Sequence, residues 1–519
     1  MTHDATARER HILRNTLLVG AFFALAAAVG LARNIVIARQ FGIGAELDAY
    51  YAAFKLPDLL FTIVAGGALA TAFIPVFSTF LAEGDRQGAW RLASAITNLV
   101  TLVVAGLALL AALAAPWLVR VLIAPGFDTA QQAETVALMR LVLVSTLFFG
   151  ISAVQSSALH GFKHFLLPAL APVVYPLGVM AGALWLAPMW GARGLAAGAI
   201  LGAALHLAVK VPGLIHYGLR WWPALDLNRP AVRRVLILMG PRVLDLGVFH
   251  LTLLATTNLA SRLGPGSVSA LEWGWDAMQL PETVIGTAFG LVAFPTLAEL
   301  AARGDLAGLR HTLGQTLRLV LALTVPAAAG LVLLGQPLLQ LLYQRGAFDA
   351  AATQAVYAAL RFYALGLVGH ACLELAARTF FAQQDTVTPL LIAAASAAAN
   401  ILLGVLLMGA LDHAGLALAN SLAVSAEVLV LVFILRRRLR SVEGRQTLRA
   451  LGRVLVATLL MGVVIGGVLA LERRAGAGAL EMVATGGLAG LVSYVAAGLL
   501  LGVDELRRLP ATLLARRPT

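Results

Sequence analysis

The sequence has a single cysteine, few charged residues and no long polar segment. Cys372 lies within an apolar run, which excludes an intramolecular disulfide framework and a cysteine-rich metal site and fits a small buried side chain. Charged residues make up 12% of the 519 positions, about half of the roughly 25% found in soluble domains. The chain also lacks a phosphate-binding P-loop, an HExxH zinc motif and a nucleophile elbow. We therefore expect no enzyme activity, no metal site and no cofactor.

Apolar residues dominate what is present. They account for 60% of the chain, and the mean hydropathy is +0.87. The net charge of +12 comes from cations in short clusters between apolar runs, as in loops that face anionic lipid. Because no nucleic-acid recognition motif accompanies this charge, we expect membrane lipids as partners and no nucleic acid.

A membrane span needs about 20 mostly apolar residues, and this length predicts an all-α polytopic membrane protein of about fourteen transmembrane helices. The first apolar run, about 15–40, is too long for a cleaved signal peptide. The predicted spans are 14–40, 48–82, 92–122, 133–160, 165–187, 193–218, 232–262, 268–301, 308–342, 352–381, 387–410, 414–436, 450–471 and 480–502.

Arginine and lysine are concentrated in alternate loops, with the largest cluster at 436–453. Cytoplasmic loops carry this excess in membrane proteins. We therefore expect both termini to be cytoplasmic, which agrees with an even number of spans.

The chain contains an internal repeat. Phe127, Arg140 and Pro168 recur 221 residues later as Phe348, Arg361 and Pro389. Pro75 and Gly84-Asp85 recur 220 residues later as Pro295 and Gly304-Asp305. Two copies of six spans have the same orientation and are typical of transporters that alternate between inward- and outward-open states. We predict an N-lobe at 1–218, a C-lobe at 219–440, and helices 13 and 14 with a tail at 441–519.

Charged residues inside predicted spans are costly unless they face a protein interior or a wet cavity. Glu272, Asp276, Gln279 and Thr283 recur at helical spacing, and Glu374 and Arg378 lie one turn apart. The alternatives are interhelical ion pairs that fix packing, or side chains that reach the membrane surface. The candidate cavity residues from this pattern are Arg33, Asp48, Arg242, Asp245, Glu272, Asp276, Glu374 and Arg378.

With these residues in place, the chain resembles the MurJ (MviN) family of lipid II flippases, in the multidrug/oligosaccharidyl-lipid/polysaccharide exporter superfamily. The opening segment is fairly specific to that family, and the similar pieces are ordered across the first twelve spans. They are LARNIVIARQFGIGAELDAYYAAFKLPDLL at 31–60, AFIPVF at 72–77, APGFD at 124–128, LPALAPVVYPLG at 167–178, MGP at 239–241, GSVSAL at 266–271 and FFAQQDTVTP at 380–389.

The resemblance implies a two-lobe, fourteen-helix protein of the bacterial inner membrane that moves a lipid-linked peptidoglycan precursor outward for cell-wall synthesis. It further implies alternating access around a cationic cavity, driven by an ion gradient (Na⁺ or H⁺) or by the membrane potential. A pyrophosphate is well matched by arginine side chains. We expect a monomer.

The chain departs from the family pattern at charged positions. Asn34, also a candidate cavity residue, replaces an aspartate after Arg33, and Phe61-Thr62 replace an arginine pair. Ala26-Ala27 replace Ser-Arg, and Ala277 replaces an arginine after Asp276. Arg33 alone clearly survives among the family's cavity arginines, with Arg242 and Arg378 as substitutes.

Three alternatives to lipid II transport therefore stay open. The first is a flippase for another polyprenyl-pyrophosphate-linked glycan, and the second is an exporter of organic cations like the multidrug and toxin extrusion (MATE) proteins. The third is a transport-inactive scaffold for the cell-wall machinery, whose 436–453 arginines would bind partners.

Overall fold

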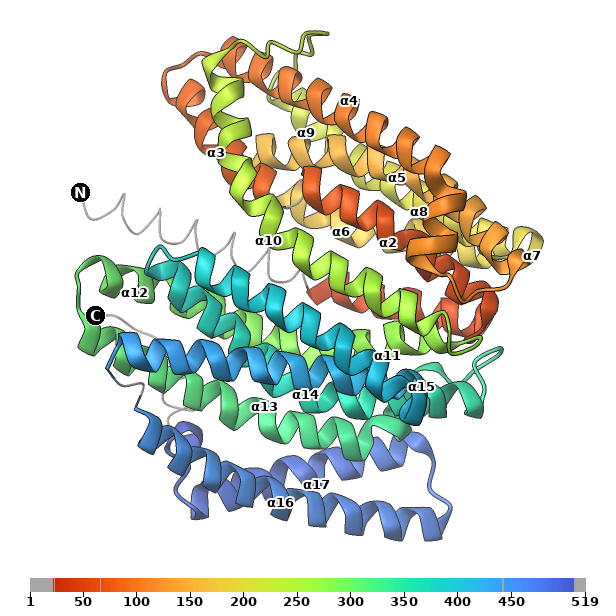
Figure 1. Ribbon diagram of the computed structural model, residues 1–519, viewed down its shortest axis with the longest axis vertical. Helices are drawn as coiled ribbons and strands as arrows, with labels where there is room; N and C mark the ends of the chain where they lie inside the picture. The colour runs from red at the N-terminus through yellow and green to blue at the C-terminus, as the bar shows by residue number, and fades with distance from the viewer. Residues whose placement is uncertain (1–21, 23, 66, 441–442, 508–519) are drawn as a thin grey trace. The chain divides into compact units, whose positions relative to one another are not determined.

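The computed structural model describes residues 22, 24–65, 67–440 and 443–507, and the side chains of 64–68 and 240–246 fall outside this description. Every regular element in the described part is a helix (Figure 1). Eleven of the described helices are long and apolar enough to cross a membrane. The predicted all-α polytopic membrane fold is confirmed, whereas the total of fourteen spans stays a prediction.

The first compact unit contains the described residues up to Pro265 together with Arg345–Phe348. Its first helix is Ala24–Phe41. The other elements are α2 (Ala45–Ala65), α3 (Gly67–Ala82), α4 (Arg86–Leu118), η1 (Val119–Ile123), α5 (Thr129–Gly161), α6 (Leu166–Ala181), η2 (Gly182–Leu186), α7 (Ala187–Trp190), α8 (Ala192–Ala208), α9 (Val211–His216) and α10 (Pro230–Ala260). Helix α5 packs against α2, α3, α4 and α8, and α10 packs against α2 and α3.

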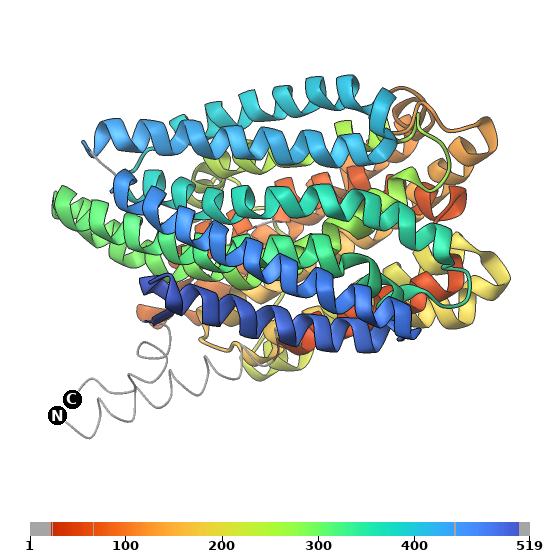
Figure 2. The same ribbon diagram turned by 90° about the horizontal axis from the view of Figure 1, so that it is seen from below.

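The second compact unit contains Gly266–Gln344 and the described residues from Asp349 onward. Its elements are α11 (Ser267–Glu282), η3 (Thr283–Thr287), α12 (Ala288–Ala302), α13 (Leu306–Tyr343), α14 (Ala350–Ala382), α15 (Val387–Arg438), α16 (Gly444–Ala475) and α17 (Ala479–Leu500). Helix α14 packs against α11, α12, α13 and α15. Helices α16 and α17 lie side by side in both views and pack against α13 (Figures 1 and 2). The predicted division at 218 and 440 stays a prediction.

Aspartates cap four helices at positions that the repeat relates to one another. Asp85 accepts a hydrogen bond from the backbone N–H of Gly88, and Asp305 does the same for Gly308. Asp128 and Asp349, 221 residues apart, cap α5 and α14 in the same way. A side-chain acceptor at this position satisfies an N–H that the helix leaves free. The repeated aspartates therefore cap corresponding helices in the two halves of the chain.

Two sharp breaks also recur at the same spacing. Gly191 precedes α8 with φ 54° and ψ −138°, and Asp412 interrupts α15 with φ 49° and ψ −139°. Three residues later, Gly194 touches the backbone of Leu186, and Gly415 touches that of Leu407. The two glycines let the chain fold back closely on itself after each break. Asp412 thus separates the two predicted spans 387–410 and 414–436 within α15.

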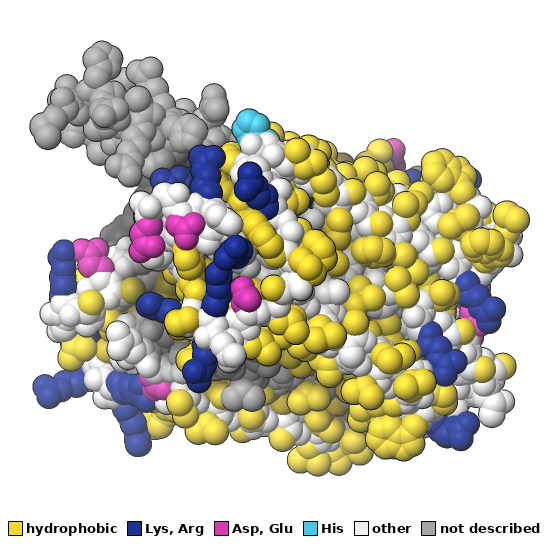
Figure 3. Space-filling model, turned by 90° about the horizontal axis from the view of Figure 1, so that it is seen from above, with side chains coloured by type: hydrophobic (Ala, Val, Ile, Leu, Met, Phe, Trp, Pro, Cys, Tyr) yellow, Lys and Arg dark blue, Asp and Glu magenta, His cyan; other side chains and the backbone are white. Residues whose placement is uncertain are grey.

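The packed interior is apolar, and so is much of the outer surface. In the first unit Phe73, Phe77 and Trp90 join one buried cluster, and in the second Leu297, Phe380 and Leu431 join another. Figure 3 shows a face with hydrophobic side chains across its middle and Lys and Arg gathered toward its ends. Leu110 and Leu113 on α4 are more than 60% exposed. Such a band is what a lipid-facing surface requires.

Candidate functional site

Arg33 lies midway along the first described helix and is half-buried. Its Nε and Nη2 atoms donate hydrogen bonds to Oδ1 of Asn34, at 3.0 and 2.7 Å. Asn34 itself is only 9% exposed. The amide that replaces the family's carboxylate therefore still orients the guanidinium, but it does not neutralise its charge.

Tyrosines and one carboxylate surround this arginine within the first unit. The charges of Arg33 and Asp58 both act electrostatically on Tyr50 and Tyr175. Tyr50 packs against Phe54, with ring centroids 4.7 Å apart. The helix Ala24–Phe41, α2 and α6 thus bring a cation, an anion and two phenols together. From sequence alone only Arg33 was a candidate here.

Asp48 is predicted to line the cavity, and the structure places it in the first turn of α2 with no exposed surface. A buried charge is stable only when other polar groups compensate it. In this conformation Asp48 is part of the packed interior of the first unit.

The first unit contains a second polar cluster that was not predicted from the sequence. Lys210, between α8 and α9, is fully buried. Its ammonium group donates to the carbonyl oxygen of Ser152 at 2.7 Å and to Oγ of Ser156 at 2.9 Å, and it also contacts Oγ of Ser152. Nδ1 of His206 lies 2.7 Å from the same Ser152 hydroxyl. The only available signal was one lysine inside an apolar run, which gave no hint of its partners on α5.

The second unit carries a polar seam between α11 and α14. Nη2 of Arg378 lies 2.6 Å from Oε2 of Glu374, which confirms the predicted pairing along the helix. One turn earlier, Nε2 of His370 lies 3.0 Å from Oδ1 of Asn420 on α15. The ring of Trp275 on α11 meets His370 edge-on, with centroids 5.1 Å apart. Aromatic and amide groups thus accompany the predicted charges.

Glu272 and Asp276 stand on α11 and are half-buried. Glu272 acts electrostatically on Tyr363 of α14, which places it in the same seam. The predicted stripe assumed a regular α-helix as far as Thr283, but the π-helical turn η3 begins at that residue. The N–H of Thr283 still bonds to the carbonyl oxygen of Gln279, so the regular repeat reaches Thr283 and the π-turn changes it only after that residue.

Glu282, the last residue of α11, was not among the predicted residues. Oγ1 of Thr287 donates to its Oε1 at 3.4 Å, and Glu282 interacts electrostatically with Glu374 and Arg378. Gly286 abuts Ala371, and Gly290 abuts Arg378. Because neither glycine has a side chain, η3 and α12 pack closely against α14. Glu282, Glu374 and Arg378 therefore come together.

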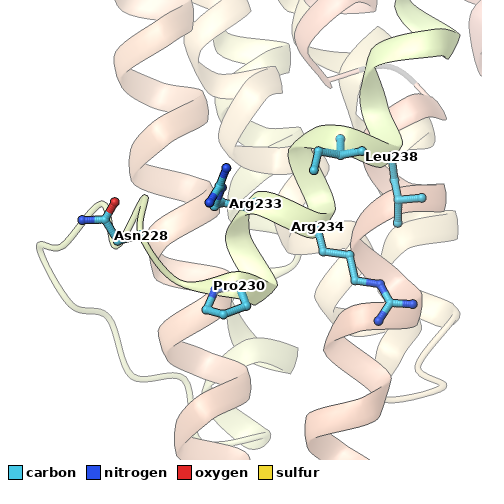
Figure 4. Close-up of a pocket in the computed structure, with 6 residues that line it drawn as sticks. Asn228, Pro230, Arg233, Arg234 and Leu238 are labelled. Carbon is cyan, nitrogen blue, oxygen red and sulfur yellow. The ribbon is translucent and has the colours of Figure 1, made fainter.

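Arg242 and Asp245 lie within α10, but their side chains are outside the described part. Nearer the start of α10, a hollow of about 340 Å³ is lined by Asn228, Pro230, Arg233, Arg234, Ile237 and Leu238. Figure 4 shows Arg233 and Arg234 directed to different sides of the helix. Their guanidinium groups therefore do not converge on one anion. Within the described residues, no group of three or more His, Cys, Asp or Glu side chains is arranged to hold a metal ion.

Comparison with known proteins gives one consistent family. The family model of the lipid II flippase MurJ matches residues 37–483. The lipid II flippase MurJ of Burkholderia cenocepacia is 32% identical over 438 residues, covering 82% of this chain and 84% of the relative. The chain belongs to the MurJ lipid II flippase family. A probable lipid II flippase MurJ of Rhizobium tropici is also 32% identical, over 84% of this chain and 83% of its own length.

Solved structures share the fold of this MurJ family member. A lipid II flippase MurJ in an inward closed conformation aligns over 95% of this chain and 100% of its own, with a TM-score of 0.79 and 23% identity. An inward-facing MATE-family multidrug transporter aligns over 81% of this chain and 96% of its own, with a TM-score of 0.70 and 14% identity. At these identities the likeness establishes the fold alone.

The departures from the MurJ pattern occupy packed positions. Phe61, where the family carries an arginine, packs against Phe149 with centroids 5.4 Å apart. Phe149 in turn contacts Tyr175 and His206. Ala277 is 9% exposed. Apolar contacts thus stand at the two positions where the resemblance implies an arginine. In the first helix, the structure places Arg33 beside aromatic and hydroxyl groups.

Proposed function

We propose that this protein is a flippase that moves the lipid-linked peptidoglycan precursor lipid II between the leaflets of the bacterial inner membrane. The observation that carries the proposal is the family match across residues 37–483, together with Arg33 inside a membrane-crossing helix. No covalent change of the substrate is part of the proposal. The activity is transport alone.

Arg33 is the residue we assign to the pyrophosphate. A guanidinium has five N–H donors in a planar fork that matches phosphate oxygens. Asn34 accepts from Nε and Nη2 and so fixes the plane, while Nη1 is the donor we assign to the ligand. Tyr50 and Tyr175 supply phenol groups beside it. Alternating access would then expose this site to one side of the membrane after the other.

A coupling cation, Na⁺ or H⁺, is the second part of the proposal. Among the described residues, Glu282 and Glu374 both interact with Arg378, and two carboxylates beside one arginine leave one negative charge to be balanced. Low dielectric makes such an imbalance costly. A monovalent cation or a proton would balance it. We further propose that the protein works as a monomer with both termini in the cytoplasm.

Rescue of a bacterium depleted of its own lipid II flippase tests the proposal. The wild-type chain should restore growth, and Arg33→Ala should lose rescue, since the phosphate then has no partner. Arg33→Lys should retain part of it because the charge remains. Arg193→Ala is the matched control, because Arg193 is 56% exposed and pairs with Glu134 at the surface. Failure of the well-expressed wild-type chain would reject lipid II as substrate.

Export of an organic cation is the second candidate, and one observation favours it. The described residues of α11 and α14 include four carboxylates, Glu272, Asp276, Glu282 and Glu374, and a cavity lined by carboxylates attracts cations. Efflux of a cationic dye from cells expressing the chain would support this function. Glu272→Gln should then abolish efflux, whereas a flippase should show no dye efflux with either residue.

A further inference from the structure

A groove along α4 in the first unit lies apart from the candidate site residues described above. Its volume is about 600 Å³. One wall is α4 from Trp90 to Ala105, and the other is the last third of α5, with Leu214 of α9 and the loop at 219–221 at one end. Since fifteen residues of helix span about 22 Å, the groove is long and narrow.

The two ends of the groove differ in chemistry. Helices α4 and α5 are antiparallel, and Gly150 meets Val100 and Val104, so Gln155 lies nearer the Trp90 end. The polar lining side chains Ser94, Thr97, Asn98 and Gln155 therefore gather toward that end, and Thr101 lies one turn beyond them. The other end, at Leu102 and Ala105, is apolar, and Leu102 is 59% exposed. The groove thus runs from a polar mouth to a surface that faces hydrocarbon.

Aromatic and cationic residues surround the polar mouth. Trp221 is 61% exposed, and its Nε1 donates to Oδ1 of Asn98 at 2.9 Å. The Asn98 amide donates to the carbonyl oxygens of Trp222 and Ala224, at 2.7 and 2.9 Å. Arg91 lies over the Trp222 ring, 5.7 Å from its centroid. Tryptophan at this depth is typical of the membrane–water interface.

Hydrogen bonds attach the loop that carries Trp221 to α4. Oγ of Ser94 donates to the carbonyl oxygen of Arg220 at 3.2 Å, and Nε1 of Trp90 donates to that of Tyr217 at 3.3 Å. Arg91 and Arg220 flank these anchors, and both are exposed. Arg91 follows Trp90 and Arg220 precedes Trp221 in sequence, so both cations adjoin residues that line the mouth of the groove.

We propose that this groove binds an anionic glycerophospholipid, with one acyl chain along α4 and α5 and the phosphate beside Arg91 and Arg220. Three features agree on this occupant. The length of the groove is comparable to one leaflet, since half the hydrocarbon core is about 15 Å. The apolar end opens toward lipid. The mouth matches an anion, and each arginine near an anionic headgroup contributes about 1 kcal/mol.

Quenching of tryptophan fluorescence by brominated lipid tests the site, because Trp90 and Trp221 line it. The full-length protein is placed in nanodiscs of phosphatidylcholine that contain either brominated phosphatidylglycerol or brominated phosphatidylcholine. The wild type should be quenched more strongly by the anionic lipid. Arg91→Gln combined with Arg220→Gln should weaken that preference by roughly thirtyfold. Arg193→Gln, away from the groove, should leave it unchanged.

A filling substitution tests the acyl-chain position separately. Ala105→Phe places a ring inside the groove and should reduce quenching by both lipids. Ala114→Phe is the matched control, since Ala114 lies on the same helix but is exposed outside the groove. Thermal unfolding in phosphatidylcholine verifies that both variants fold.

Two results would overturn the proposal. One is equal quenching of the wild type by the two lipids. The other is identical behaviour of Ala105→Phe and Ala114→Phe. A mass measurement showing a dimer that Ala105→Phe dissociates would instead assign the groove to a second copy of the chain, which also rejects a lipid occupant.

Discussion

Asp412 holds a backbone conformation that glycine adopts with far less strain. At φ 49° and ψ −139° the Cβ atom crowds the neighbouring peptide groups, and such residues cost about 1–3 kcal/mol. The first half of the chain has Gly191 in the same conformation, 221 positions earlier. Asp412 is thus a strained residue at a break where the repeat elsewhere uses glycine.

Replacing Asp412 by glycine should stabilise the protein by about 1 kcal/mol, because the strain relieved exceeds the extra chain entropy of glycine. The thermal unfolding midpoint of the purified protein measures the change. Gly191→Asp should destabilise it, since a side chain there would meet the Glu46 carboxylate, which accepts from the Ala192 N–H at 2.6 Å. A lower midpoint for Asp412→Gly would contradict the prediction.

Single residues show how far sequence reasoning reaches into the site. Arg33 stands out because a cation inside an apolar run is costly anywhere but in a protein interior or a wet cavity. Its neighbours Tyr50 and Tyr175 do not stand out, because they come from other helices and are ordinary residues in an apolar sequence. Glu374 and Arg378 were predictable as a pair, since they are one turn apart on one helix. Contacts within a helix follow from spacing, and contacts between helices do not.

At the scale of elements, a carboxylate joins the two ends of α15. Oδ2 of Asp385, just before α15, lies 2.7 Å from Nη1 of Arg438 at its far end. Asp385 also accepts from the N–H and hydroxyl of Thr388, at 2.9 and 2.6 Å. Burial alone would raise the pKa of Asp385, but the hydrogen bonds from Thr388 and Arg438 outweigh it and lower the pKa to about 2.

Because this pKa is lower in the folded state, the contribution of Asp385 to stability is present above about pH 4, the ordinary value, and is lost as the pH falls toward 2. Asp385→Asn should cost about 1 kcal/mol at neutral pH, a small value since Arg438 is 38% exposed and screened by solvent. The difference between the unfolding midpoints of the two proteins should narrow as the pH falls from 6 to 3. A gap independent of pH would exclude the ionised carboxylate as the cause.

A second ionic contact attaches the C-terminal helix pair. Arg318 of α13 is 11% exposed and lies 2.7 Å from Glu443, before α16, and 3.3 Å from Glu505, after α17. Burial would raise the pKa of Glu443, but hydrogen bonds from His311 and Arg318 lower it. Tyr494 of α17 donates to the carbonyl oxygen of Ala322 at 2.5 Å. Arg318 thus links α13 both to the segment before α16 and to the segment after α17.

Arg318→Met should destabilise this attachment by about 3 kcal/mol, because it removes the arginine that both half-buried carboxylates contact. Hydrogen exchange should then increase in α16 and α17 and stay unchanged in α4 and α5. Arg303→Met is the control, since Arg303 forms an exposed pair with Glu299 on its own helix. Exchange that rises equally throughout the protein would indicate general unfolding and contradict the assigned role.

Elements also mark the limit of prediction by span length. Apolar runs gave the positions of the long helices because a fixed membrane thickness sets their length. They gave no sign of the π-turn η3, which depends on how Gly286 and Gly290 pack against α14. That turn places Gly286 against Ala371 and Glu282, and it changes the helix repeat after Thr283. A period of 3.6 residues cannot anticipate such a shift.

For the whole molecule, the repeat is the feature that sequence predicted most fully. Matching aspartates cap matching helices, and Gly194 and Gly415 make the same close contact in each half. These agreements arise because caps and tight turns depend on local sequence. The charged residues of the two interiors do not match, since Arg33 and Lys210 lie in the first half and Glu282 and Glu374 in the second. Two copies of one scaffold have thus acquired different polar interiors.

The orientation of this scaffold in the membrane gives the last prediction. Because Cys372 is the only cysteine and is buried, Cys372→Ala provides a background for single exposed cysteines. Gln87 lies next to Arg86 in the first turn of α4. We expect Gln87→Cys to be cytoplasmic and protected from an impermeant maleimide in intact cells. Ala475→Cys, at the end of α16, should be external and react. Both positions are exposed in the structure, so membrane sidedness alone separates them. Reaction of Gln87→Cys with protection of Ala475→Cys would invert the topology and place both termini outside.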